Sequence, residues 1–217
     1  MTPRTPLALL LLCLAPGVAL AHPHVFIDAG LDVHLDGQNR VTAVRVTWSY
    51  DDFYSLVTIQ DRDMDRDGDG RLTEAELDEL ARTDVDWDEG FPGDILLESG
   101  GGEVALDRPT AFTARYEDGR LITSHLRALS VPVDVSARPL IARIFDPTFF
   151  VAYDVTLPIT VDKAPGCAIA RVPADLDAAY TLVEELLYGP QSQTYGEDDY
   201  PEVGAAFADT LTIACAG

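Results

Sequence analysis

The sequence predicts a mainly β protein (α+β): an antiparallel β-sandwich with a helix–loop–helix insertion and a C-terminal amphipathic helix. Three observations lead to this fold class. Two long segments alternate apolar and polar residues with the period of two that a half-buried strand requires. Shorter segments of the same kind follow, separated by glycine-rich and Asp-Gly turns. Between residues 52 and 83 the apolar period changes to that of helices.

The two long alternating segments form a predicted hairpin. In residues 22–35 the apolar face runs from Pro23 to Leu35, and residues 41–50 alternate again with Val44, Val46 and Trp48 on one face. A Gly-Gln-Asn turn joins the two segments. The further predicted strands cover residues 95–98, 103–106, 110–116, 120–129, 139–145, 148–157 and 210–215.

Three helices are predicted. The first one in the insertion should bury a face made by Phe53, Leu56, Val57 and Gln60. The second should begin near Thr73. The third covers residues 174–188, and its predicted buried stripe consists of Leu176, Tyr180, Val183, Leu186 and Leu187.

The first 21 residues have the three parts of a secretory signal peptide. Arg4 supplies the positive charge, Leu7–Leu14 the apolar run, and Ala19-Leu20-Ala21 the cleavage site. The apolar run is shorter than the roughly 20 residues that span a bilayer. We therefore expect a periplasmic protein whose mature chain, residues 22–217, is one β-rich domain with no segment inserted in the membrane.

The charge of the chain limits its partners. It has 37 Asp and Glu against 15 Lys and Arg, a net charge of −22. Such a chain repels nucleic acid and anionic lipid and favours cations as ligands. For most of these acids, solvation of the surface remains the simpler explanation.

Two cysteines, Cys167 and Cys215, follow the signal peptide. In an oxidising compartment such a pair is predicted to form one disulfide that ties the C-terminal strand to the rest of the domain. A thiolate metal site is the alternative, although the two residues do not form a C-x-x-C motif.

Residues 65–76 match the twelve-residue calcium loop of an EF-hand. Short carboxylates stand at positions 1, 3 and 5, Gly70 stands at the sharp turn of position 6, and a glutamate able to chelate with both oxygens stands at position 12. The predicted calcium ligands are the side chains of Asp65, Asp67, Asp69 and Glu76 and the backbone carbonyl of Arg71.

Two alternatives to this calcium loop stay open. A register that starts at Asp63 would put Glu74 at position 12, but it places apolar Leu72 at position 10 rather than at the core-facing position 8. A solvated acidic turn is the other explanation. A single EF-hand in an exported protein is expected to stabilise the structure rather than to act as a switch.

Signal cleavage would expose the sequence His22-Pro23-His24 as a new N-terminus. The amine and imidazole of His22, together with the ring of His24, can hold copper, zinc or nickel. Pro23 lacks the amide hydrogen that a square-planar site through backbone nitrogens needs. A histidine brace therefore remains, with His125 as a candidate third imidazole; the alternative is that these histidines are simply exposed or structural.

Three segments resemble an uncharacterised bacterial family, domain of unknown function 1007. They are His22 to Asp28, Trp48 to Ser55 without Asp52, and Phe145 to Phe150, and the resemblance covers nearly the whole mature chain. Members are described as periplasmic components of ABC-type transport systems and are associated with nickel, cobalt or zinc exporters. The resemblance implies a periplasmic role in metal handling and supplies no catalytic residue.

These observations favour a periplasmic metal-binding accessory protein that serves a membrane metal transporter and carries a structural calcium ion. One alternative is a calcium-stabilised interaction module without a transition metal. The other is a histidine-brace copper enzyme, whose site Phe149 or Tyr153 could line. We expect no enzyme activity, because the sequence has no Ser/His/Asp order, no H-E-x-x-H motif and no phosphate loop.

Overall fold

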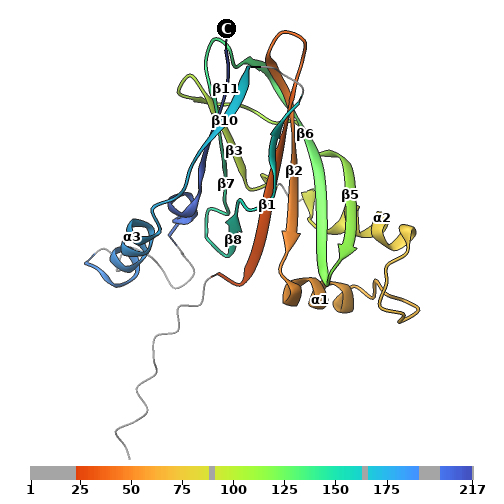
Figure 1. Cartoon of the computed structure of the whole chain (residues 1–217). Helices are drawn as coiled ribbons and strands as arrows, with labels where there is room; N and C mark the ends of the chain where they lie inside the picture. Colours follow the sequence, from red (N-terminus) through yellow and green to blue (C-terminus); the bar gives the residue numbers. More distant parts are fainter. Residues whose placement is uncertain (1–22, 88–90, 163–165, 191–200, 217) are drawn as a thin grey trace, which may run out of the picture.

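The computed structural model describes residues 23–87, 91–162, 166–190 and 201–216. Within them the chain is mainly strands, which form one mixed and one antiparallel sheet, with three α-helices (Figure 1). The predicted signal peptide and His22 lie outside the described residues.

The mixed sheet is built around the predicted hairpin. Its strand order is β5-β6-β2-β1-β8, and β9 also pairs with β1. The bounds are β1 Val25–Leu35, β2 Arg40–Tyr50, β5 Thr110–Glu117, β6 Arg120–Asp134, β8 Val151–Asp154 and β9 Ile159–Val161. The β1–β2 hairpin is confirmed, but β8 and β9 run parallel to β1. The expected all-antiparallel arrangement is therefore wrong here, because the chain returns from the second sheet to the free edge of β1 in the same direction as β1.

The second sheet is antiparallel and has the order β10-β11-β7-β3-β4. Its strands are β3 Ile95–Ser99, β4 Gly102–Glu103, β7 Leu140–Ile144, β10 Cys167–Val172 and β11 Thr210–Cys215. The prediction missed β10 together with β9 of the first sheet. β9 has only three residues, too few to establish an alternation, and β10 is an edge strand with mostly exposed residues.

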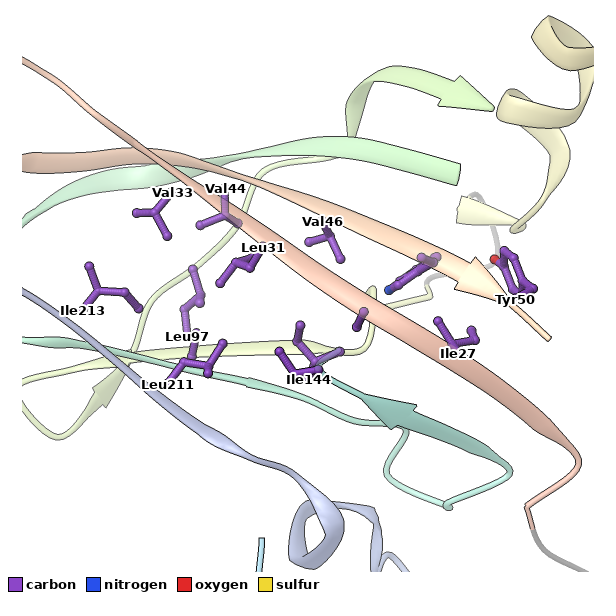
Figure 2. Packing of buried hydrophobic residues seen from close by; sticks show 14 of the residues in the cluster. Ile27, Leu31, Val33, Val44, Val46, Tyr50, Leu97, Ile144, Leu211 and Ile213 are labelled. Atoms are coloured by element: carbon purple, nitrogen blue, oxygen red, sulfur yellow. The ribbon is translucent and has the colours of Figure 1, made fainter. Parts of the chain in front are cut away.

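One hydrophobic core joins the two sheets. Figure 2 shows side chains of β1 and β2 facing those of the second sheet, with Leu31 and Val46 on one side and Ile144 and Leu211 on the other. The predicted apolar face of β1 is confirmed, since Val25, Ile27, Ala29, Leu31 and Val33 are all buried. Each large side chain in this cluster contributes about 1.5–3 kcal/mol by leaving water.

Helix α1 spans Asp52–Asp61 and buries a different face from the predicted one. Phe53 and Leu56 are 76% and 47% exposed, whereas Ser55 is fully buried together with Thr58 and Ile59. The reason is a polar contact, because the Ser55 hydroxyl accepts a hydrogen bond from the backbone N–H of Leu121 at 2.9 Å. This bond turns the small polar face of the helix toward β6.

Helix α2 spans Glu74–Thr83, and its predicted beginning at Thr73 is confirmed. Thr73 is the N-cap, and it forms a reciprocal capping box with Glu76. Leu80 and Ala81 bury the helix against the sheet. The capping box and the apolar face thus determine where α2 begins and how it packs.

Helix α3 spans Leu176–Tyr188, and its buried stripe differs from the predicted one. Leu176 and Tyr180 are 53% and 51% exposed, whereas Ala179 and Val183 are buried. The helix packs mainly against the 3₁₀ segment Gly204–Phe207, where the rings of Tyr180 and Phe207 are 5.1 Å apart. A single short segment covers only a narrow strip of α3, so part of the apolar face stays in water.

Cys167 and Cys215 lie opposite each other in the β10–β11 pair and form a disulfide. The predicted pairing is confirmed, and both thiols are consumed by it. A disulfide is consistent with a compartment outside the cytoplasm. In the described part of the chain, no helix is both long and apolar enough to cross a membrane.

Candidate metal loop and an aromatic, acidic cavity

The loop between α1 and α2 gathers three carboxylates. Oxygen atoms of Asp65, Asp67 and Asp69 all lie within 4.8 Å of one another. Backbone N–H groups shape the loop, since Gly70 donates to Asp65 at 2.9 Å and Arg71 donates to Asp69 at 2.8 Å. Gly70 has φ +79°, a conformation that favours glycine. Converging carboxylates in water-accessible positions are the ligands of a hard cation.

Glu76, the predicted ligand of position 12, is engaged elsewhere. Its carboxylate accepts hydrogen bonds from the backbone N–H and the hydroxyl of Thr73, both at 2.8 Å, and from the Arg66 N–H at 3.3 Å. The Thr73 bonds, chiefly that of the backbone N–H, hold the pKa of Glu76 below its usual value. Glu76 therefore caps α2 and is not part of the group of three aspartates.

Of the predicted transition-metal ligands, His22 lies outside the described residues, and His24 and His125 are not brought together. His24 is exposed just before β1, where its backbone N–H donates to the Phe150 carbonyl at 2.9 Å and its ring lies 4.8 Å from that of Phe150. His125 on β6 is opposite Val46, which is itself opposite Leu31 of β1. Seven residues separate Leu31 from His24, or roughly 23 Å along the strand.

His125 lies in an aromatic environment. It is 2% exposed, and its ring centroid is 4.8 Å from those of Trp48 and Trp87. Burial lowers the pKa of His125 to about 3, and the charges of Arg127 and Arg45 contribute in the same direction. The ring is therefore neutral near pH 7, and its Nε2 has no hydrogen-bond partner among the described residues.

The family-like segments meet at a cavity of about 300 Å³ at one end of the β1–β2 hairpin. Figure 2 shows Ile27 and Tyr50, which pair across the hairpin, at this end of the core. Each of the three segments that carry the resemblance supplies lining residues. The lining residues are Val25, Ile27, Trp48, Tyr50, Tyr54, Asp84, Val85, Phe91, Asp94, Asp146, Phe150, Val151 and Tyr153.

Asp94 is the most deeply buried acid in this cavity. It is 7% exposed, and its Oδ2 accepts a hydrogen bond from the Tyr153 hydroxyl at 2.7 Å. Burial raises the pKa of Asp94 to about 7; the charge of Asp146 raises it further and the Tyr153 bond opposes the shift. Burial also raises the pKa of Asp84 to about 6. Near neutral pH both carboxyl groups are therefore partly protonated.

The sequence pattern did not point to this cavity. Residues 84–94 look like an acidic connector, and both Asp84 and Asp94 lie in it. The one signal in the sequence is that Asp94 stands directly before an apolar strand. The structure adds that its backbone has a positive φ of +47°. Among the residues that line the cavity, Tyr153 is a candidate site residue from the sequence, as part of the wall of a copper site.

A family model described as "Protein of unknown function (DUF1007)" matches residues 7–215. No curated protein matches the chain. The match covers almost the full length of the chain, including both sheets, the loop between α1 and α2, and the cavity. The chain belongs to the DUF1007 family.

Proposed function

We propose that this protein is a periplasmic metal-binding accessory protein that holds a structural calcium ion and handles a transition metal for a membrane transporter. The observation that carries the proposal is the convergence of Asp65, Asp67 and Asp69 between two helices. A protein of net charge −22 attracts cations over much of its surface, but only converging ligands give a specific site.

Calcium in the loop would use the three aspartates, the Arg71 carbonyl and Glu76. Calcium accepts six to eight oxygen ligands in flexible geometry, so water can complete the set. Glu76 would have to exchange its bonds to Thr73 and Arg66 for the ion, while Thr73 can continue to cap α2 through its own hydroxyl. Calcium would then tie α1 to α2, which suits a stabilising role.

The transition metal is assigned to the N-terminus of the exported chain. His22 would contribute its amine and ring, and His24 a second ring next to Phe150. Neutral imidazoles suit copper, zinc or nickel. The contact of His24 with Phe150, directly before β8, supports a defined position for His24. The proposal does not use His125.

Calorimetric titration of the exported protein with Cu²⁺, Zn²⁺ and Ni²⁺ tests the assignment. Replacing both His22 and His24 by alanine should lower the affinity for the preferred metal at least 100-fold. The matched control is His34→Ala, which removes a histidine of β1 that bonds Asp162 instead. Unchanged affinity in the double variant would rule out the N-terminal site.

Two other functions are distinguished by simple measurements. A calcium-stabilised interaction module would lose thermal stability on chelation of calcium and would show no response to copper, zinc or nickel. A histidine-brace copper enzyme would oxidise a substrate in the presence of copper and a reductant. A calcium site at Asp65, Asp67 and Asp69 is expected both for the interaction module and for the main proposal. The titration with transition metals therefore decides between these two functions.

A further inference from the structure

The cavity at the end of the β1–β2 hairpin has aromatic walls from several parts of the fold. The indole of Trp48 and the ring of Tyr50 come from β2, Tyr54 from α1 and Tyr153 from β8. The rings of Tyr50 and Tyr54 stack with centroids 5.1 Å apart, and those of Trp48 and Tyr153 are 6.0 Å apart. The aromatic lining residues are Trp48, Tyr50, Tyr54, Phe91, Phe150 and Tyr153.

Every charged residue that lines this cavity is an aspartate. Asp84 comes from the C-terminal end of α2, Asp94 directly precedes β3, and Asp146 follows β7. Asp146 is engaged in shaping its own loop, since it accepts hydrogen bonds from the backbone N–H groups of Thr148 and Val151. Because these bonds hold Asp146 in its loop, Asp84 and Asp94 are the carboxylates assigned to a ligand, and Asp146 adds to the negative charge of the cavity.

We infer that this cavity binds a small organic cation, a primary to quaternary ammonium compound, between its aromatic walls and the carboxylates of Asp84 and Asp94. Ring faces attract an ammonium ion, and the attraction grows when water is excluded. A volume of about 300 Å³ suits a ligand of small size. This inference uses none of the proposed metal ligands.

A metal ion fits the cavity less well than an ammonium ion. A metal ion needs several ligand atoms close together. Among the described residues, ligand atoms of three or more acid, histidine or cysteine side chains lie within 4.8 Å of one another only at Asp65, Asp67 and Asp69. The cavity aspartates are too far apart to form such a group. An ammonium ion spreads its charge over several carbon and hydrogen atoms, so separated carboxylates and ring faces can stabilise it together.

One wall residue has an unused hydrogen-bond donor. Trp48 is 1% exposed, and its Nε1–H has no partner among the described residues. A buried donor without a partner costs about 1–3 kcal/mol. An organic ligand with an oxygen next to its cationic group, such as an amino alcohol, carries an acceptor that can satisfy a donor of this kind.

The surroundings of the two acids predict how binding depends on pH. Asp94 faces Tyr153 of β8 and the charge of Asp146, while Asp84 faces Tyr50 of β2 and Arg62 at the C-cap of α1. Burial keeps both acids partly protonated near neutral pH, with pKa values of about 7 and about 6. A bound cation favours the ionised carboxylates, so binding should release protons and become tighter from pH 6 to pH 8.

The test compares choline with its uncharged isostere, 3,3-dimethylbutan-1-ol, on the calcium-loaded protein at pH 8. Isothermal titration and the fluorescence of Trp48 and Trp87 should both report choline binding, at least tenfold tighter than that of the isostere. Asp94→Asn should weaken choline binding at least tenfold. Asn tolerates the left-handed φ of +47° at this position, so the variant keeps the backbone.

The matched control is Asp118→Asn, which makes the same change in an exposed turn at φ +52°. This variant should bind choline like the unaltered protein. Equal binding of the isostere would show an apolar pocket without charge recognition and would overturn the inference. If Asp94→Asn and Asp118→Asn weaken choline binding equally, the overall charge of the protein explains the effect and the inference is overturned. It is also overturned if the folded protein binds none of choline, methylammonium and tetramethylammonium.

Discussion

Three aspartates converge in the loop between α1 and α2 and three line the cavity beside β1, yet the environments of the two groups are opposite. In the loop, Asp67 and Asp69 are exposed and their oxygens converge with those of Asp65. In the cavity, Asp94 is 7% exposed, lies among aromatic rings and is bonded to a tyrosine hydroxyl. The comparison teaches that burial and spacing, rather than residue type, decide whether an aspartate suits a hard cation or holds a proton.

The largest expected effect concerns the pH dependence of stability. Asp94 has a pKa of about 7 in the folded protein and an ordinary value of 3.8, so between these values the folded state binds the extra proton. The stability that Asp94 contributes is therefore fully present below pH 4 and is lost as the pH rises to about 7, by at most about 4 kcal/mol. Urea unfolding at pH 4.5 and 7.5 measures this loss.

The variant Asp94→Asn should remove the part of this pH dependence that Asp94 contributes, because an amide does not ionise, and should leave the part that Asp84 contributes at lower pH. Asp118→Asn in the exposed turn should keep it. If both variants follow the unaltered protein between pH 4.5 and 7.5, Asp94 does not titrate with a raised pKa, and the contrast between the cavity and the loop is wrong.

Calcium should act on the loop and leave the cavity unchanged. At a free calcium concentration one hundred times the Kd, binding stabilises the folded protein by about 2.7 kcal/mol. Asp65→Asn should abolish most of this gain, whereas Asp94→Asn should retain it. Thermal unfolding with calcium and with EGTA gives the result, and a calcium response that survives Asp65→Asn would remove this loop as the site.

The hydroxyl of Tyr153 should have an intermediate effect. Tyr153→Phe removes the donor to Asp94, and a lost hydrogen bond to a charged group costs about 1.5–3 kcal/mol. That bond lowers the pKa of Asp94, so its loss should raise the pKa further and make the variant less stable, mainly at pH 8. Carboxyl ¹³C chemical shifts measured against pH follow Asp94 directly; a lower pKa in Tyr153→Phe would contradict the assigned role of this bond.

Much of the fold could be predicted because its signals are local. The alternation in β1 and β2, the beginning of the second helix near Thr73 and the pair Cys167–Cys215 are all predicted from the sequence and are confirmed. Other features depend on distant partners. The buried face of α1 follows from the bond between Ser55 and Leu121, 66 residues away, which no local period records.

The two candidate sites differ in the same way. The loop is contiguous, so the spacing of Asp65, Asp67 and Asp69 predicts their convergence. The cavity draws on segments from Val25 to Tyr153, which strand pairing and the second sheet bring together. Asp94 has no repeating pattern around it, and its raised pKa depends on burial by residues far away in the chain. Sequence reasoning therefore finds the loop and misses the cavity.

The smallest effect on stability, and the sharpest test of the loop, comes from Glu76→Gln. Glutamine can keep the capping box with Thr73, so without calcium the variant should lose less than about 0.5 kcal/mol. It cannot chelate calcium with two carboxylate oxygens, so the affinity for calcium should fall at least tenfold. The matched variant Glu74→Gln lies two residues away in the first turn of the same helix. Calcium titration separates the two registers of the loop, because a site that starts at Asp65 loses affinity in Glu76→Gln, whereas one that starts at Asp63 loses it in Glu74→Gln.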